Sequence, residues 1–72
     1  ALSLAQLQAF HITKKQFEVI RLICQGKDNQ QIAMALFISV STVKTHIQHI
    51  FQKLAVQNKA QLLSKLMQLH NE

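Results

Sequence analysis

The sequence predicts an all-α fold, a domain of four helices, on three observations. Its 72 residues include no proline and one glycine, Gly26, so few positions break a helix. Its apolar residues recur at spacings of three and four, which is typical of amphipathic helices. A chain of this length is one domain at most. Its single cysteine excludes an internal disulfide, so the domain is stabilised by packing alone.

The first predicted helix follows Thr13. Thr13 and Gln16 are three residues apart and form a capping box at its start, and Gly26 supplies the left-handed residue that ends it. Its apolar residues fall on one stripe, which we expect to face the core. Cys24 is interpreted as a small core residue of that stripe. The stripe consists of Phe17, Val19, Ile20, Ile23 and Cys24.

Two further helices follow, a short one and a longer one. Asp28 or Asn29 caps the short helix, and Ser39 caps the longer one after a tight turn. The small Ala33 lets the two helices cross closely. This layout is that of a helix-turn-helix, which we place at residues 29–48. The longer helix carries one apolar stripe, made of Val40, Val43, Ile47, Ile50, Phe51 and Leu54.

A last helix begins at Asn58, again with a glutamine three residues later at Gln61. Its apolar arc is wide for an end element of a small domain, and includes Leu62, Leu63, Leu66, Met67 and Leu69. Residues 1–11 are expected to be a linker or a leading helical segment. The helix-turn-helix domain is then expected to span residues 12–72.

The charge of the chain indicates a class of partner. Eight Lys and Arg against three Asp and Glu give a formal net charge of +5, which suits nucleic acid, an acidic membrane surface or simple solubility. No apolar run is long enough to cross a bilayer and no signal peptide is evident, so we expect a cytoplasmic protein without a membrane partner. The chain has no carboxylate pair, phosphate-binding glycine loop or Ser/His/Asp set. We therefore expect no enzyme, no catalytic residue and no cofactor.

The outward side of the longer helix narrows this choice to DNA. It is polar, and no carboxylate occurs between Asp28 and Glu72. A major groove admits one helix, where a lysine such as Lys44 donates to guanine, a glutamine such as Gln48 pairs with adenine, and the methyl group of Thr45 meets that of thymine. Basic and hydroxyl side chains on the flanks, among them His49, are expected to bind phosphate.

The residues also carry a family resemblance. Ile32-Ala33, then Ser39-x-x-Thr42-Val43-Lys44-x-His46, then Lys53-Leu54 resemble the LuxR-type (GerE/NarL-like) DNA-binding domain, from Ile12 to about Leu66. The resemblance implies the output domain of a bacterial transcriptional regulator, which binds double-stranded DNA as a homodimer through its last helix, with RNA polymerase as a further candidate partner.

The polar face, the wide apolar arc and the resemblance together give the expected site residues. Base contacts are expected from Ser41, Lys44, Thr45 and Gln48. Backbone contacts are expected from Asn29, Thr42, His46, His49, Lys53 and Lys59. Dimerisation is expected from Leu63, Leu66, Met67 and His70.

Three positions depart from the family pattern. Gln16 replaces the usual glutamate, which removes an ion pair with a basic residue nearby. Ala55 replaces the usual glycine, so a left-handed backbone there would cost about 1 kcal/mol. Lys59 replaces the usual arginine and keeps its charge but not its planar fork.

Other interpretations stay open from the sequence alone. A region-4-like module of a sigma factor shares the helical layout and binds promoter DNA. A helical protein-interaction domain would use the leucine-rich last helix, with its charge incidental. His46 and His49 have the spacing of metal ligands, but the sequence offers no third ligand, so we expect no metal site.

Overall fold

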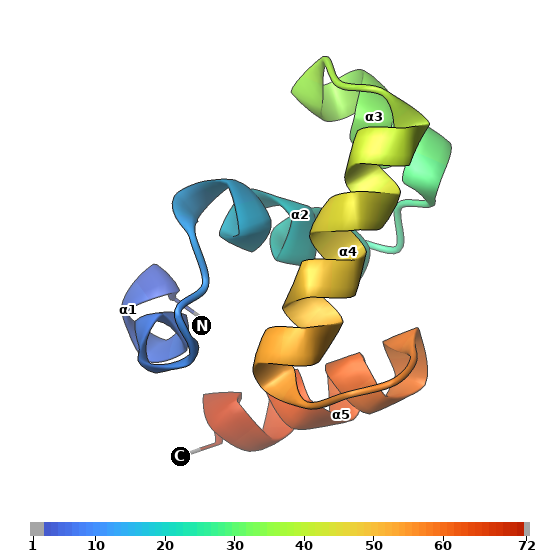
Figure 1. Ribbon diagram of the computed structural model, residues 1–72. Coiled ribbons are helices and arrows are strands. Elements are labelled where there is room, and N and C mark those ends of the chain that lie inside the picture. The colour runs from blue at the N-terminus through green and yellow to red at the C-terminus, as the bar shows by residue number, and fades with distance from the viewer. Residues whose placement is uncertain (1–2, 72) are drawn as a thin grey trace.

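The computed structural model describes residues 3–71, and between them the chain is entirely helical apart from its connections (Figure 1). The predicted all-α fold is confirmed. Residues 1, 2 and 72, which the predicted ranges 1–11 and 12–72 include, lie outside the described residues. The elements are α1 (Leu4–Leu7), the 3₁₀ helix η1 (Gln8–Phe10), α2 (Lys14–Cys24), α3 (Asn29–Leu36), α4 (Val40–Leu54) and α5 (Lys59–His70).

Side-chain caps begin the helices at the predicted residues. The hydroxyl of Thr13 accepts from the N–H of Gln16, whose side chain accepts from the N–H of Thr13, both at 3.1 Å. Of the two candidates at α3, Asp28 is the cap, and its carboxylate accepts from the N–H of Gln31 at 2.8 Å. These bonds satisfy N–H groups that have no partner inside the helix. Ser39 caps α4 and Asn58 caps α5 in the same way.

Three helices end in one backbone motif. After α2, α3 and α4 the chain enters the left-handed region at Gly26 (φ 83°), Phe37 (φ 58°) and Ala55 (φ 57°). The following N–H then donates to a carbonyl five residues earlier, as Val56 does to Phe51 at 2.9 Å. This is the Schellman arrangement, which favours glycine at the left-handed position. Only α2 has a glycine there, so α3 and α4 end in strained backbone.

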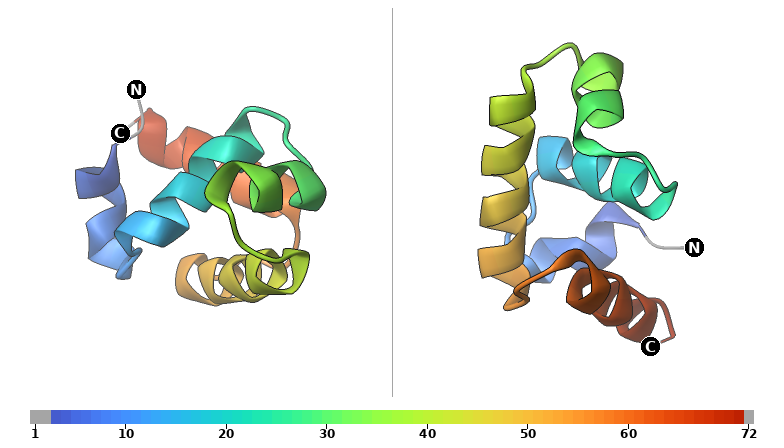
Figure 2. Two further views of the ribbon diagram at one scale, coloured as in Figure 1. Left: turned by 90° about the horizontal axis from the view of Figure 1, so that it is seen from above. Right: turned by 90° about the vertical axis from the view of Figure 1, so that its right-hand side faces the viewer.

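The helix-turn-helix consists of α3 and α4. Ala33 is buried between the two helices, as expected for a small residue that lets them cross closely. Seen from above, α4 lies on one side of the molecule with α2, α3 and α5 behind it (Figure 2). One long side of α4 is therefore open.

No helix between residues 3 and 71 is long and apolar enough to span a membrane.

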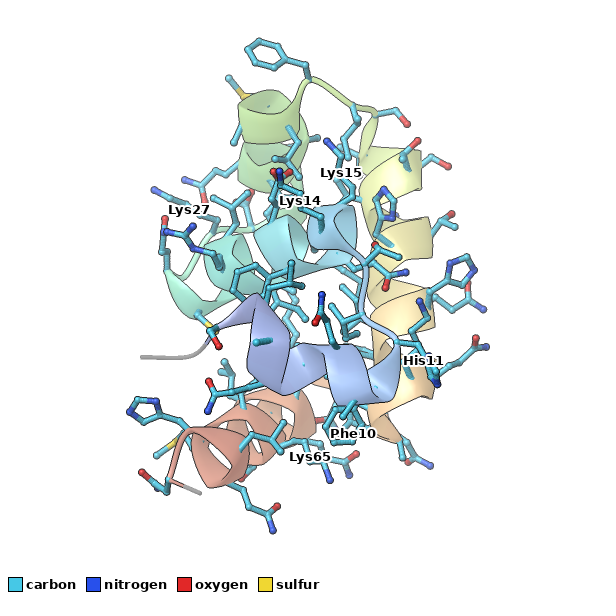
Figure 3. The ribbon with its side chains drawn as sticks, turned by 90° about the vertical axis from the view of Figure 1, so that its left-hand side faces the viewer. Phe10, His11, Lys14, Lys15, Lys27 and Lys65 are labelled. Carbon is cyan, nitrogen blue, oxygen red and sulfur yellow. The ribbon has the colours of Figure 1, made fainter. Side chains whose placement is uncertain are left out.

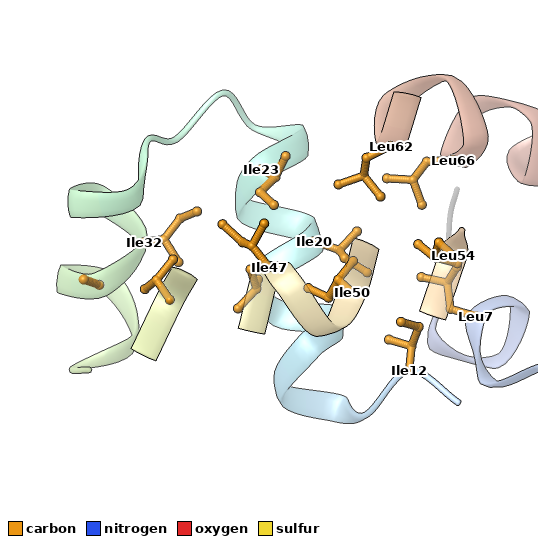
Figure 4. Close-up of a cluster of buried hydrophobic side chains, with 13 residues drawn as sticks. Leu7, Ile12, Ile20, Ile23, Ile32, Ile47, Ile50, Leu54, Leu62 and Leu66 are labelled. Atoms are coloured by element: carbon orange, nitrogen blue, oxygen red, sulfur yellow. The ribbon is translucent and has the colours of Figure 1, made fainter. Parts of the chain in front are cut away.

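A single apolar core lies behind α4 (Figure 4). The α4 stripe contributes Val43, Ile47, Ile50 and Leu54, all of them buried. Facing side chains come from every other α-helix: Leu7, Val19, Ile20, Ile23, Ile32, Ala33, Leu62 and Leu66. The apolar spacing seen in the sequence thus becomes one packed interior that fixes the rotation of α4 about its axis.

The leading segment packs into the same core. Leu7 of α1 is fully buried and Ile12 is 4% exposed. The ammonium of Lys65 lies 5.5 Å from the centre of the Phe10 ring, a cation–π contact between α5 and η1. Within the described range, residues 4–10 are therefore a packed part of this unit.

Ala55→Gly is expected to stabilise the fold. Glycine relieves the left-handed strain at φ 57°, and the expected gain is about 0.5–1 kcal/mol in the free energy of unfolding after its extra backbone entropy is counted. Urea denaturation measures it. Ala60→Gly in α5, where the backbone is helical, is the matched control and should lose up to about 1 kcal/mol. Equal effects of the two changes would contradict the strain.

Leu7→Ala is expected to cost about 2–5 kcal/mol in the free energy of unfolding, because it leaves a cavity in the core. That loss is a large share of the stability of a domain this small. Leu4→Ala, one turn earlier at a partly exposed residue, should cost clearly less. Thermal unfolding of both variants tests the packing of α1, and a Leu7 variant as stable as the wild type would refute it.

Candidate nucleic-acid interface

The open side of α4 carries the four predicted base-contact residues in one strip. Ser41, Lys44, Thr45 and Gln48 are all exposed, and the spacings of three and four align them along the helix. The opposite side of the same turns is buried in the core. The packing of α4 therefore presents these four side chains together and to the outside.

The hydroxyl of Thr45 is occupied within the helix. It donates to the backbone carbonyl of Ser41 at 3.2 Å. The hydroxyl hydrogen is therefore not free for a base acceptor, while the hydroxyl oxygen can still accept and the methyl group can make the expected contact with a thymine methyl.

The first turn of α4 is held rigid by its cap. The oxygen of the Ser39 hydroxyl accepts from the N–H of Thr42 at 3.0 Å and lies 2.9 Å from the hydroxyl oxygen of Thr42. Thr42 is exposed and is one of the predicted backbone contacts. Its hydroxyl is thus oriented before any ligand arrives.

The flank of α4 beside that strip holds Thr42, His46, His49 and Lys53. His49 is exposed, whereas His46 and Lys53 are partly buried. The Lys53 ammonium donates to the backbone carbonyl of His11 and to the side-chain oxygen of Gln16, each at 2.8 Å. Lys53 is therefore anchored to the end of η1 and the start of α2, an arrangement that the sequence alone did not show. Figure 3 shows His11 beside the lower half of α4.

Two residues of this region were not predicted as site residues: Gln52, and Gln16, which the sequence pattern marked as a helix cap and the resemblance placed near a basic residue without identifying it. Gln52 is exposed, one turn after Gln48, and the spacing of four that aligned the other polar residues could have found it. Gln16 is 6% exposed and acts through Lys53, which is 37 residues away in the sequence. No local pattern connects that pair.

The remaining predicted backbone contacts lie on other helices. Asn29 and Lys59 are the first residues of α3 and α5. Lys59 is exposed. Asn29 is partly buried, and its side-chain oxygen has no hydrogen-bond partner among the described residues. At α5 the cap is the neutral Asn58, so the N–H groups beside Lys59 favour phosphate. At α3 the cap is the Asp28 carboxylate, which opposes phosphate binding beside Asn29.

Neither described carboxylate belongs to α4. Glu18 of α2 pairs with Lys15 at 3.5 Å, and Asp28 caps α3. Residues 29–71 contain none. The open side of α4 therefore has hydroxyl, amide, imidazole and ammonium groups and no opposing negative charge. The part of the chain that the structure describes contains no cluster of three or more His, Cys, Asp or Glu that could hold a metal ion.

A second surface lies on α5. Leu63, Met67 and His70 are exposed, and Leu66 beneath them is 4% exposed and belongs to the core. They line a shallow apolar hollow together with Cys24 of α2 and Asn71. Of the four predicted dimerisation residues, three thus present side chains to the outside.

The expectation that Cys24 is a core residue is wrong. Cys24 is the last residue of α2 and is exposed, because it lines the open hollow beside α5 and does not pack into the core. Its partial burial raises the pKa of the Cys24 thiol.

Comparisons with known proteins identify the family. The family model described as "Bacterial regulatory proteins, luxR family" matches residues 11–66. The transcriptional regulatory protein LiaR of Bacillus subtilis is 46% identical over 50 residues, which cover 69% of this chain and 24% of LiaR. The response regulator protein VraR of Staphylococcus aureus is 42% identical over 60 residues, which cover 83% of this chain and 28% of VraR.

The chain thus spans about a quarter of the length of these curated relatives. No significant match is found among solved structures. The family match covers α2 to α4 completely and most of α5. It therefore includes the whole helix-turn-helix. The chain belongs to the luxR family of bacterial regulatory proteins, a family of DNA-binding transcription regulators.

Proposed function

We propose that this chain binds double-stranded DNA sequence-specifically by placing α4 in the major groove. The observation that carries the proposal is the exposed strip of α4, which has no carboxylate on it and is held outward by the buried stripe behind it. A groove lined by phosphates favours such a face, and its width matches one helix. The function is binding and not catalysis.

The base contacts follow from the chemistry of the strip. Lys44 donates to guanine O6 and N7, and Gln48 forms paired hydrogen bonds with adenine N6 and N7. The methyl group of Thr45 meets a thymine methyl, while its hydroxyl hydrogen is donated to the carbonyl of Ser41. Ser41 reads the base nearest the start of the helix.

Backbone contacts surround this strip. Side chains on the flank of α4 and at two other helix starts bind phosphate oxygens and fix the register of the domain on DNA. Those contacts carry affinity and its salt dependence rather than sequence information. The residues are Asn29, Thr42, His46, His49, Lys53 and Lys59.

The names of the relatives suggest the wider setting. LiaR is a transcriptional regulatory protein and VraR a response regulator, so we infer that this chain is the output domain of a cytoplasmic transcriptional regulator. RNA polymerase is a candidate partner. Met34 in the last turn of α3 and Phe37 directly after that helix are exposed and offer apolar side chains for such a protein contact.

We further propose that two copies associate through α5. The exposed Leu63 and Met67 and the neighbouring His70 form an apolar surface over the buried Leu66. A two-fold axis would bring the same surface of each copy together. Two α4 helices would then read half-sites separated by about one helical turn of DNA.

Lys44→Ala is expected to weaken binding to a duplex selected from random DNA by the wild-type chain. If the contact with guanine is bidentate, the loss is about 1–3 kcal/mol, and the preference for that base relaxes. Fluorescence anisotropy with base-substituted duplexes measures both effects. Lys27→Ala is the matched control. It removes the same charge from the connection between α2 and α3, on the far side of the molecule from α4 (Figure 3).

An equal loss in the Lys27 and Lys44 variants would mean that net charge alone binds the DNA, and the assignment of α4 would fail. Binding by the wild type that does not change with salt would instead favour a protein-interaction domain. The proposal requires a fall in log affinity with log salt of about 0.9 for each phosphate contact.

Met67→Glu is expected to abolish association of two copies on a palindromic duplex, because it places two like charges in an apolar contact. Analytical ultracentrifugation with the duplex measures the stoichiometry. Gln68→Glu is the matched control, since it adds the same charge to an exposed α5 position outside the apolar hollow. Tight binding by one wild-type copy to a single element would favour the sigma-factor-like interpretation instead.

A further inference from the structure

Lys53 joins three segments that are far apart in the sequence. It stands in the last turn of α4, while its two acceptors are the carbonyl of His11, after η1, and the side chain of Gln16, in the first turn of α2. The oxygen of Gln16 also accepts from the N–H of Thr13 at 3.1 Å. One buried amide oxygen thus completes the α2 cap and holds the ammonium of the helix proposed to bind DNA.

Both acceptors of Lys53 are neutral. The ion pair found among residues 3–71 is Lys15 with Glu18, so the charge of Lys53 meets no carboxylate there. An ammonium has three N–H donors, and two of them are used in these bonds. The third N–H and the full positive charge are left for an outside acceptor, on a side chain that is only partly buried.

We propose that Gln16 is a positioning residue for phosphate binding, which orients the Lys53 ammonium toward the DNA backbone without neutralising it. The inference rests on the proposed function, in which Lys53 binds phosphate. A carboxylate at the same position would hold the ammonium more tightly, because hydrogen bonds between ions are stronger than those to a neutral acceptor. It would also cancel the charge that attracts the phosphate.

The amide therefore has two effects of opposite sign. Relative to a carboxylate, it weakens the link between α2 and α4, which lowers stability. It also keeps one more uncompensated charge beside the proposed DNA-binding face, which raises affinity for any sequence. A residue with only a structural role would move stability and affinity in the same direction.

Gln16→Glu tests this directly in the 72-residue chain. We expect a higher unfolding temperature together with binding about three- to tenfold weaker at ~0.1 M salt, for a random duplex as well as for a selected one. The slope of log affinity against log salt should become shallower by up to about 0.9. Anisotropy with a fluorescein-labelled random duplex and thermal unfolding give the two readouts.

Gln6→Glu is the matched control. Gln6 occupies the same capping-box position in α1, where its side chain accepts from the N–H of Ser3 at 2.9 Å, and the substitution adds the same charge to the chain. We expect little change in its salt slope. Equal weakening by the two variants would attribute the effect to net charge and overturn the role of Gln16.

Lys53→Met tests whether the Lys53 ammonium itself binds phosphate. It should reproduce the shallower salt slope while lowering the unfolding temperature, because two hydrogen bonds are lost. An unchanged slope in Lys53→Met, or unchanged affinity in Gln16→Glu, would overturn this inference but leave DNA binding by α4 standing. Failure of the wild type to bind either duplex would overturn the proposed function itself.

Discussion

The burial of one side of α4 is the constraint on which the rest of the molecule depends. Helices α2, α3 and α5 all contact α4, and its stripe from Val43 to Leu54 lies in the centre of the core. Once that stripe is fixed, the rotation of α4 is fixed, and the polar residues on its other side must face outward. The same packing of α4 thus stabilises the fold and presents the polar strip that we propose contacts DNA bases.

Helix starts could be predicted from the sequence, but the backbone conformation that ends two of the helices could not. Caps are made by local side chains, so Thr13, Ser39 and Asn58 were recognisable from type and spacing. The ends at Phe37 and Ala55 take left-handed backbone without a glycine. Local preference opposes that backbone, and the packing of the following segments imposes it. Left-handed backbone at Ala55 could be anticipated only because the related family usually has glycine at that position.

Some features of the candidate site could likewise be predicted from the sequence, and others could not. The outward strip follows from a period of 3.6 residues, so Lys44 and Gln48 could be placed by counting. The partners of Lys53 are 37 and 42 residues away, and only the tertiary fold brings them together. Leu66, on the wide apolar arc of α5, and Cys24, at the end of the α2 stripe, show the limit of counting. Periodicity gives a direction, while the neighbouring helix decides how much of each side chain it covers.

The neutral helix caps of this chain provide less stability than acidic caps would, but they keep negative charge away from the proposed DNA-binding face. The helix starts at α2, α4 and α5 are capped by the neutral Thr13, Ser39 and Asn58, and the one acidic cap, Asp28, belongs to α3. An acidic cap would interact more favourably with the helix dipole. It would also repel phosphate if it stood near DNA. Neutral cap oxygens accept from the same N–H groups but stabilise the helix less than a carboxylate would. The neutral side-chain oxygen of Gln16 does the same at the start of α2, and it also holds the Lys53 ammonium without cancelling its charge.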